Sequence, residues 1–366
     1  MNRFERQIKL EGFGNIGQQK LRDAKVLVVG AGGLGCPALL YLAAAGIGTI
    51  AIADGDSVSI SNLNRQIIFS ERDVNKLKAE VAANYLKEKY NDLHIETINA
   101  FLTNENSLQI ITKYDLIIDG SDNFETRYLI NDACVLLHKP LVFGAIFQNE
   151  GQVAVFNVSR KNITSTNYRD VFPDPPLPEE IPDCNITGVL GVLPGIIGVM
   201  MASEAIKLLS GFGKPLINKL LFYNLITNSF YETEILPNIN ATVTAPITFE
   251  EFTSTNYNLQ CKLVATISWS EALTMKNQSQ NNVLLVDIRE LHEQPRLDDI
   301  EYTNIPMQEL FNSTEELSKA ENIVVFCQSG IRSVKAAKAL ADTFPHKSIF
   351  SINGGISHYK KTATNK

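Results

Sequence analysis

The sequence contains one stretch of 28 residues without formal charge, which extends from Val26 to Ala53. A run of this length is long enough to span a lipid bilayer. Six glycines interrupt it, however, and they fall where a β-branched strand would turn into a helix and where that helix would end. We therefore interpret the stretch as a strand, a loop, a helix and a second strand in the core of an α/β domain, not as a membrane span.

Strands and helices alternate from this stretch to residue 147. Short apolar runs predict strands at 25–30, 49–53, 94–98, 115–119 and 141–147, and the residues between them predict helices at 36–45, 76–90 and 125–138. Such alternation predicts a Rossmann-like, doubly wound parallel sheet. A helix over 189–209 and a hairpin over 219–235 are expected to follow.

The chain of 366 residues is long enough for two or three domains, at roughly 100–200 residues each. Residues 241–262 show no sustained periodicity and are expected to form a linker. They divide a first domain, 1–240, from a second, smaller α/β domain, 263–366. In the second domain we expect strands at 283–288, 323–326 and 348–352, and a helix at 333–340.

Charge and cysteine content exclude several classes of protein. There are 33 basic and 40 acidic side chains, which argues against nucleic acid or an anionic membrane as the main partner. The beginning of the chain has no apolar segment typical of a signal peptide. The cysteines lie at least 50 residues apart, so we expect neither a disulfide framework nor a Cys-rich zinc site. We expect the protein to be cytoplasmic. The cysteines are Cys36, Cys134, Cys184, Cys261 and Cys327.

A glycine-rich loop follows the first predicted strand. Gly30, Gly32, Gly33 and Gly35 fit the pattern G-x-G-x-x-G, in which backbone N–H groups at a helix N-terminus approach phosphate oxygens. Asp54 ends the next strand, where a carboxylate could bind ribose hydroxyls. These features predict nucleotide binding; the alternative is a tight packing turn.

The residues after Asp54 favour a triphosphate over a dinucleotide. Arg65 and Lys78 place two cations just beyond the ribose carboxylate. Adenylyl transfer needs such cations for the α-phosphate and the leaving pyrophosphate, whereas hydride transfer does not. A nicotinamide-dependent oxidoreductase remains an alternative, but it would leave both cations and the Cys327 loop unexplained.

Cys327 lies between a predicted strand and a predicted helix, in the sequence Cys-Gln-Ser-Gly-Ile-Arg. Backbone N–H groups, a helix N-terminus and Arg332 would all favour a thiolate or a persulfide there. Four residues separate Cys327 from Arg332, and this spacing resembles the rhodanese active-site loop. Protein tyrosine phosphatases have five residues in between. The alternatives are a buried structural cysteine and a non-catalytic docking module.

The motifs of the first domain together resemble the MoeB/ThiF family. They are the glycine loop, the run Asp-Gly-Asp-Ser-Val-Ser-Ile-Ser-Asn-Leu-Asn-Arg-Gln from Asp54, Lys78, and Gly-Ser-Asp-Asn from Gly120. The resemblance covers residues 3–235. It implies adenylation by MgATP of the C-terminal glycine of a small ubiquitin-like sulfur-carrier protein of the MoaD or ThiS type, which ends in Gly-Gly.

The resemblance also implies roles for single residues. Asp122 would hold Mg²⁺ through ATP, and Arg6 would reach the ATP of the other subunit, which implies a homodimer; an exposed basic N-terminus is the alternative for Arg6. The residues implied to bind MgATP are Gly30, Gly32, Gly33, Gly35, Asp54, Asp56, Ser61, Asn62, Arg65, Gln66, Lys78, Asp122 and Asn123.

Two further points concern thiols. Family members usually carry two CxxC pairs for a structural zinc, but here residues 166–169 and 238–241 offer no thiolate, so we expect no zinc. Cys184 follows a proline-rich segment. In the family a cysteine there can bind the carrier covalently, and a loop cysteine without chemistry is the alternative.

The two domains together predict one reaction sequence. The first would activate the carrier as an acyl-adenylate, and the second would deliver sulfur from a Cys327 persulfide, received from a cysteine desulfurase or another persulfide donor. Molybdopterin synthesis, thiamine synthesis and tRNA thiolation all use this chemistry. A related ATP-dependent dehydratase acting on tRNA is an alternative that the acidic charge disfavours.

Overall fold

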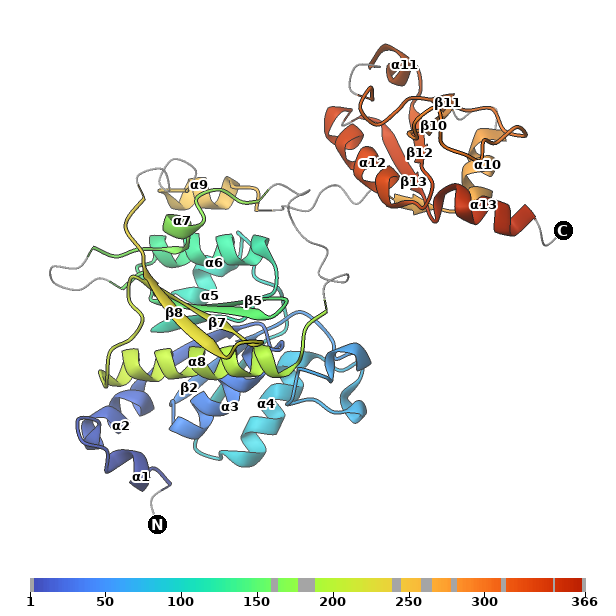
Figure 1. Ribbon diagram of the computed structural model, residues 1–366. Helices are drawn as coiled ribbons and strands as arrows, with labels where there is room; N and C mark the ends of the chain where they lie inside the picture. The colour runs from blue at the N-terminus through green and yellow to red at the C-terminus, as the bar shows by residue number, and fades with distance from the viewer. Residues whose placement is uncertain are drawn as a thin grey trace. The chain divides into compact units, whose positions relative to one another are not determined.

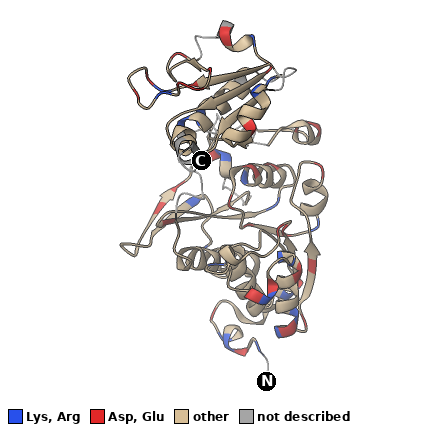
Figure 2. Cartoon of the chain, turned by 90° about the vertical axis from the view of Figure 1, so that its right-hand side faces the viewer, with Lys and Arg blue, Asp and Glu red and all other residues tan. Residues whose placement is uncertain are grey.

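The computed structural model describes residues 3–158, 164–176, 188–238, 245–257, 265–277, 282–310, 314–344 and 346–363. The chain divides into two compact units, Met1–Leu259 and Gln260–Lys366 (Figure 1). In both units Lys and Arg are interspersed with Asp and Glu (Figure 2), and some of these residues form exposed pairs such as Lys219 with Glu232.

The first unit contains a sheet of eight strands in the order β3-β2-β1-β4-β5-β6-β7-β8. The first five strands of the chain pair in parallel and the last three antiparallel. The strands are β1 Lys25–Val29, β2 Thr49–Ala53, β3 His94–Ile98, β4 Leu116–Asp119, β5 Leu141–Phe147, β6 Glu150–Phe156, β7 Lys219–Asn224 and β8 Ser229–Glu234. The predicted Rossmann-like α/β fold is confirmed.

The strand order places a crevice at the end of β1. This strand pairs with β2 on one side and with β4 on the other, so Val29 lies beside both Ala53 and Asp119. The chain order of the strands reverses at this point, and ligands of doubly wound sheets bind outside the carboxyl ends of the strands there. The glycine loop, Asp54 and the residues after β4 all begin at this edge.

Helices cover both faces of the sheet (Figure 1). One face packs against α3 Gly35–Ala45 and α8 Val192–Ser210, and the other against α6 Phe124–Leu136. The first unit also contains helices α4 Lys78–Lys89, α5 Ser107–Ile111 and α7 Tyr168–Val171, and short 3₁₀ turns at Ile60–Asn62 and Glu71–Asp73.

Helix α8 is apolar and long enough to cross a membrane, but its composition has an explanation in the core. Ile197 and Met201 are fully buried. Gly151 and Gly144 face them from β6 and β5, where an added Cβ would come within 2.3 Å and 2.2 Å of their side chains. Glycine at both positions thus lets the helix lie directly on the sheet.

Among the described residues of the first unit, five helices were not predicted from the sequence. They are α5 and α7, whose bounds are given above, and α1 Glu5–Ile8, α2 Gly14–Asp23 and α9 Phe249–Ser254. Helix α9 lies within residues 241–262, for which a linker is expected. Thr248 and Glu251 form a capping box at its start, and Phe252 is fully buried in the same hydrophobic cluster as residues of α6. The sequence did not predict this helix, because the segment lacks helical periodicity and its only strong helix signal is the short Thr-x-x-Glu capping pattern.

The segments that carry CxxC pairs in zinc-binding family members are joined here by hydrogen bonds. The Asp170 carboxylate accepts from the backbone N–H groups of Asn167 and Asn238, both at 2.7 Å. The neighbouring Arg169 forms a buried ion pair with Asp132. The described residues contain no group of three or more His, Cys, Asp or Glu side chains that could hold a metal ion; the absence of zinc stays a prediction.

The second unit contains a parallel sheet of five strands in the order β11-β10-β12-β13-β9. Its strands are β9 Ala265–Ile267, β10 Val283–Asp287, β11 Thr303–Asn304, β12 Asn322–Phe326 and β13 Ser348–Ile352. Its helices are α10 Trp269–Asn277, α11 Thr314–Ser318, α12 Ile331–Thr343 and α13 Gly355–Ala363. The central strand β12 is buried on both faces and leads directly into the Cys327 loop.

Candidate active sites

The glycine loop is shaped by close contacts between backbone groups. Gly30 has a φ of +88°, and an added Cβ would lie 2.9 Å from the carbonyl oxygen of Gly120. A Cβ on Gly35 would lie 1.8 Å from the Gly30 oxygen. Gly32 and Gly33 line the cavity described below, as Gly30 also does, but no backbone group lies within 3 Å of a Cβ added to either of them. The pattern therefore combines two glycines required for packing with two that open the loop to a ligand.

Asp54 joins the glycine loop to the segment after β2. Its carboxylate accepts hydrogen bonds from the backbone N–H groups of Ala31 at 2.7 Å and Asp56 at 2.8 Å. Burial raises the pKa of this carboxyl, although the two N–H groups oppose the shift. Each oxygen still has a second lone pair, so the carboxylate can also accept from ribose hydroxyls.

A cavity of about 520 Å³ lies at the ends of β1, β2 and β4. Asn62 and Gly35 do not line it, and Asn64 does. The predicted residues that do line it are Gly30, Gly32, Gly33, Asp54, Asp56, Ser61, Arg65, Gln66, Lys78, Asp122 and Asn123. Arg6 is an exposed residue of α1 outside the cavity, and Cys184 lies outside the described residues.

The polar groups of the cavity are compatible with a nucleoside triphosphate. The Lys78 ammonium is buried and lies 3.0 Å from the Asp56 carboxylate. Arg65 donates to the Ser61 carbonyl oxygen at 3.0 Å. The buried Gln66 Oε1 has no hydrogen-bond partner within the described structure. A buried acceptor of this kind needs a donor from a ligand or water, and a ligand with hydroxyl or amino groups would supply it.

Asp122 and Asn123 differ in what they do for the protein itself. Asn123 is the N-cap of α6, because its side-chain oxygen accepts from the Thr126 N–H at 2.8 Å. Asp122 is exposed at the cavity wall. Mg²⁺ commonly binds one or two carboxylates together with substrate phosphates, so a single carboxylate here fits the ion.

Arg127 and Asp119 lie at the same edge of the sheet, although no sequence motif indicates a role for either of them. Arg127 lines the cavity and is 9% exposed. Asp119 is buried at the end of β4; burial raises its pKa, and the nearby Arg127 charge opposes the shift. Arg127 Nε and Asp119 Oδ2 have no hydrogen-bond partner within the described structure. The sequence does contain one signal for Asp119, because it ends a predicted strand just as Asp54 does. Nothing in the sequence shows which way Arg127 points from its helix.

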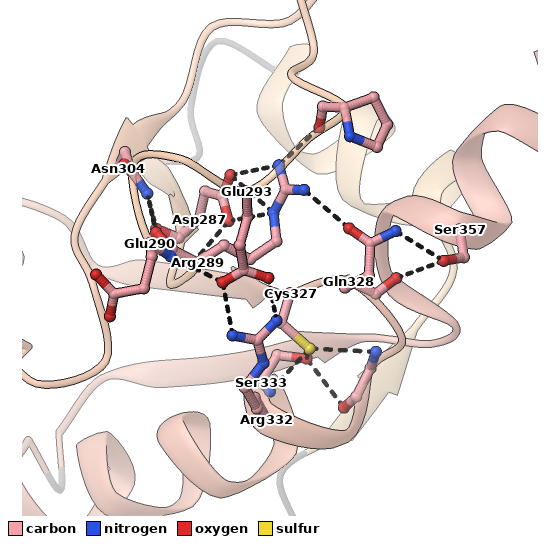
Figure 3. Close-up of polar contacts among 12 residues, drawn as sticks. Asp287, Arg289, Glu290, Glu293, Asn304, Cys327, Gln328, Arg332, Ser333 and Ser357 are labelled. Carbon is pink, nitrogen blue, oxygen red and sulfur yellow. Dashed lines mark hydrogen bonds and ion pairs between the residues drawn. The ribbon is translucent and has the colours of Figure 1, made fainter.

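The Cys327 sulfur is fully buried beneath its loop (Figure 3). The backbone N–H groups of Gly330 and Ser333 point to it at 3.2 Å and 3.3 Å, and the Ser333 hydroxyl lies at 3.6 Å. Gly330 has a φ of +91° and precedes α12 directly. The predicted arrangement of N–H groups and a helix N-terminus around the sulfur is thus present in the structure.

Arg332 is bound by the carboxylate of Glu293, a residue outside the predicted Cys327 loop. Its guanidinium donates to both oxygens of Glu293, at 2.7 Å and 2.5 Å. This contact holds the pKa of Glu293 at about 2. The positive charge of Arg332, which was expected to favour the Cys327 thiolate, is therefore largely neutralised by Glu293.

A second arginine, Arg289, holds the Cys327 loop in place through Gln328. Arg289 is fully buried, pairs with Asp287 at 2.9 Å, and donates to the side-chain oxygen of Gln328 at 2.9 Å. Gln328 in turn donates to Ser357 on α13 at 3.1 Å. These contacts hold the residue next to Cys327 between β10 and α13 (Figure 3).

Comparison with known proteins identifies both units. The ThiF family matches residues 4–243, and a rhodanese-like domain matches residues 270–362. The chain belongs to the ThiF family. The resemblance to MoeB/ThiF proteins and to rhodaneses that the sequence predicted is confirmed.

Individual relatives share one or both units with this ThiF-family chain. A sulfur carrier protein adenylyltransferase of Thermus thermophilus is 47% identical over 239 residues, 65% of this chain and 88% of that protein. The adenylyltransferase and sulfurtransferase MOCS3 of Aedes aegypti is 36% identical over 366 residues, 95% of this chain and 83% of that protein. Escherichia coli MccB, solved with AMPCPP and MccA, matches with a TM-score of 0.57 and 22% identity over 65% of this chain and 73% of its own. That last likeness concerns the fold alone.

This ThiF-family chain is therefore an enzyme that combines an adenylyltransferase unit with a sulfurtransferase unit. ATP is the nucleotide that adenylyl transfer in this family uses, and the polar groups of the cavity are compatible with it.

Proposed function

We propose that the enzyme adenylates the C-terminal glycine of a small ubiquitin-like sulfur-carrier protein and then converts this glycine to a thiocarboxylate. One observation carries the proposal: a cavity with the polar groups for a triphosphate and a buried Cys327 under convergent N–H groups occur in one chain. Separately, the two sites would support many reactions. Together they supply an activated carboxylate and a sulfur nucleophile.

In the first step, the cavity residues bind ATP and neutralise its charge. Lys78 and Arg65 would contact the phosphates, and Asp54 would accept from the ribose hydroxyls. Asp122 would hold Mg²⁺, which supplies further positive charge at the phosphates. The carrier carboxylate attacks the α-phosphorus, and the bond to pyrophosphate breaks. The cations stabilise the charge that develops on the leaving pyrophosphate.

In the second step, the Cys327 thiolate takes a sulfur atom from a persulfide donor such as a cysteine desulfurase, and the donor leaves as a thiolate. The terminal sulfur attacks the carbonyl carbon of the adenylate, and AMP leaves with the C–O electron pair. A thiol then attacks the Cys327 sulfur of this acyl disulfide and forms a new disulfide with it, so that the thiocarboxylate leaves with the electron pair of the broken S–S bond. A second thiol reduces the new disulfide and restores Cys327. Cys184 is the candidate residue for binding the carrier covalently, and a loop cysteine without chemistry is the alternative.

The wider setting is part of the same proposal. We propose molybdopterin synthesis as the pathway, with thiamine synthesis and tRNA thiolation as alternatives, and the cytoplasm as the location, where thiols stay reduced. Arg6 would complete the ATP site of the partner subunit in a homodimer. No structural zinc, nucleic acid or membrane is required.

The test measures the two steps separately in the full chain, with a Gly-Gly carrier present. In Cys327→Ala, ATP–pyrophosphate exchange should persist, while mass spectrometry should find no carrier that has gained sulfur. In Asp122→Ala, exchange itself should be lost. The proposed assignment of adenylation to the first unit and sulfur transfer to the second is wrong if ATP–pyrophosphate exchange depends on Cys327 or survives in Asp122→Ala. Sulfur transfer that persists in Cys327→Ala would instead identify the second unit as a docking module.

A further inference from the structure

The rim of the Cys327 loop carries a charged pair for which the two steps above have no use. The Arg332 guanidinium donates to both Glu293 oxygens, and one of these oxygens also accepts from the Glu290 N–H at 2.9 Å. The pair faces solvent, because the two side chains are 40% and 23% exposed. It lies beside the Cys327 sulfur, where a sulfur donor must arrive (Figure 3).

The other arginines near the loop are matched by a carboxylate as well. Arg289 and Arg296 both pair with Asp287, at 2.9 Å and 3.2 Å. The sulfur itself is approached by neutral donors, the N–H groups of Gly330 and Ser333. Among the described residues around the Cys327 loop, each of the arginines Arg289, Arg296 and Arg332 therefore already binds a carboxylate. None of these guanidinium groups is available to an incoming anion.

Sulfur donors differ in the charge that they bring to this rim. With thiosulfate, the Cys327 thiolate attacks the outer sulfur, the S–S bond breaks, and the electron pair leaves with sulfite. With a cysteine persulfide, the same attack releases a cysteine thiolate. Thiosulfate is a dianion whose sulfonate oxygens match the fork of a free guanidinium. In this loop Glu293 already occupies that fork, and its lowered pKa keeps it ionised at neutral pH.

We propose that Glu293 sets the donor specificity of the sulfurtransferase unit. By binding Arg332 it disfavours inorganic anionic donors such as thiosulfate and leaves persulfides carried on cysteine as the preferred donors. This inference rests on the proposed role of Cys327 as the sulfur-carrying residue. Glu293 acts through Arg332, so it is a positioning residue.

The test compares two donors on the full chain, with cyanide as the acceptor and thiocyanate as the product. In Glu293→Gln the KM for thiosulfate should fall about tenfold, as expected for removal of one negative charge beside the binding group. The kcat with thiosulfate and both constants with cysteine persulfide should change less than about twofold. Glu293→Asp, which keeps the charge, should stay close to wild type.

Controls separate a local effect from net charge and from folding. Glu301→Gln removes the same charge from a side chain that is 94% exposed and pairs with Lys276, and it should leave both donors unchanged. The inference is wrong if Glu293→Gln changes both donors alike, leaves the KM for thiosulfate unchanged, or behaves like Glu293→Asp. Failure of the wild type to take sulfur on Cys327 from cysteine persulfide would instead contradict the proposed function.

Discussion

The ammonium group of Lys78 lies 3.0 Å from the carboxylate of Asp56, at the wall of the nucleotide cavity. The lysine side chain is 8% exposed and the aspartate side chain 56%. A buried cation whose partner is exposed to solvent can exchange that partner for a phosphate oxygen. Asp56 thus neutralises Lys78 in the structure and can release it to a bound phosphate.

Replacement of this cation should abolish most of the adenylation without unfolding the protein. Lys78→Met keeps the length of the side chain and removes the charge, so ATP–pyrophosphate exchange should fall by about 10²–10³-fold, the usual effect of one lost electrostatic contact in a transition state. Lys76→Met is the matched control. Lys76 is two residues away, exposed and paired with Asp73, and its loss should leave exchange unchanged. Equal effects of the two substitutions would contradict the role of Lys78.

The course of the chain around the nucleotide cavity was predictable because its signals are local. The β-branched run at 25–29, the glycines after it and the apolar run at 49–53 each specify their own structure, and parallel pairing brings Asp54 to the glycine loop. Arg127 and Glu293 were not predictable. Each is an ordinary charged residue in the sequence, and only the tertiary fold places Arg127 in the cavity and Glu293 against Arg332, 39 residues away.

The ion pair between Arg169 and Asp132 gives a prediction for the stability of the first unit. Both side chains are almost fully buried, and the Asp132 carboxylate also accepts from the Tyr257 hydroxyl at 2.8 Å. Asp132→Ala would remove one charged partner of a buried ion pair, which typically costs about 3–5 kcal/mol. Circular dichroism during urea unfolding should show this loss.

A surface pair provides the comparison for that measurement. Lys219 and Glu232 are roughly half exposed, so Glu232→Ala should change the free energy of unfolding by no more than about 1 kcal/mol. The only tryptophan, Trp269, is buried in the second unit, and its fluorescence should report an unchanged transition in both variants. Equal losses in the two variants would mean that Asp132 has no special role.

Gly330 gives a prediction for the sulfur site. Its φ of +91° is unfavourable for any other residue, and an added Cβ would lie 3.0 Å from the Gly354 nitrogen. Gly330→Ala should therefore destabilise the second unit by about 1–2 kcal/mol, measured by Trp269 fluorescence. Because the Gly330 N–H points at the Cys327 sulfur, sulfur transfer should fall further than the stability loss explains. Ser329→Ala, at the exposed neighbour, should affect neither property.

The Glu293–Arg332 pair predicts how the stability of the second unit depends on pH. The pKa of Glu293 is lowered from its ordinary 4.5 to about 2, chiefly by its hydrogen bonds with Arg332. The folded state therefore binds the proton less readily than the unfolded state, so the pair stabilises the fold above pH 4.5 and loses this effect as the pH falls toward 2. The pair is partly exposed, which limits its contribution to about 1 kcal/mol or less. Trp269 fluorescence should show wild type and Glu293→Gln differing most at neutral pH and converging as the pH falls through this range. A difference that stays constant with pH would show that the carboxylate charge does not stabilise the unit.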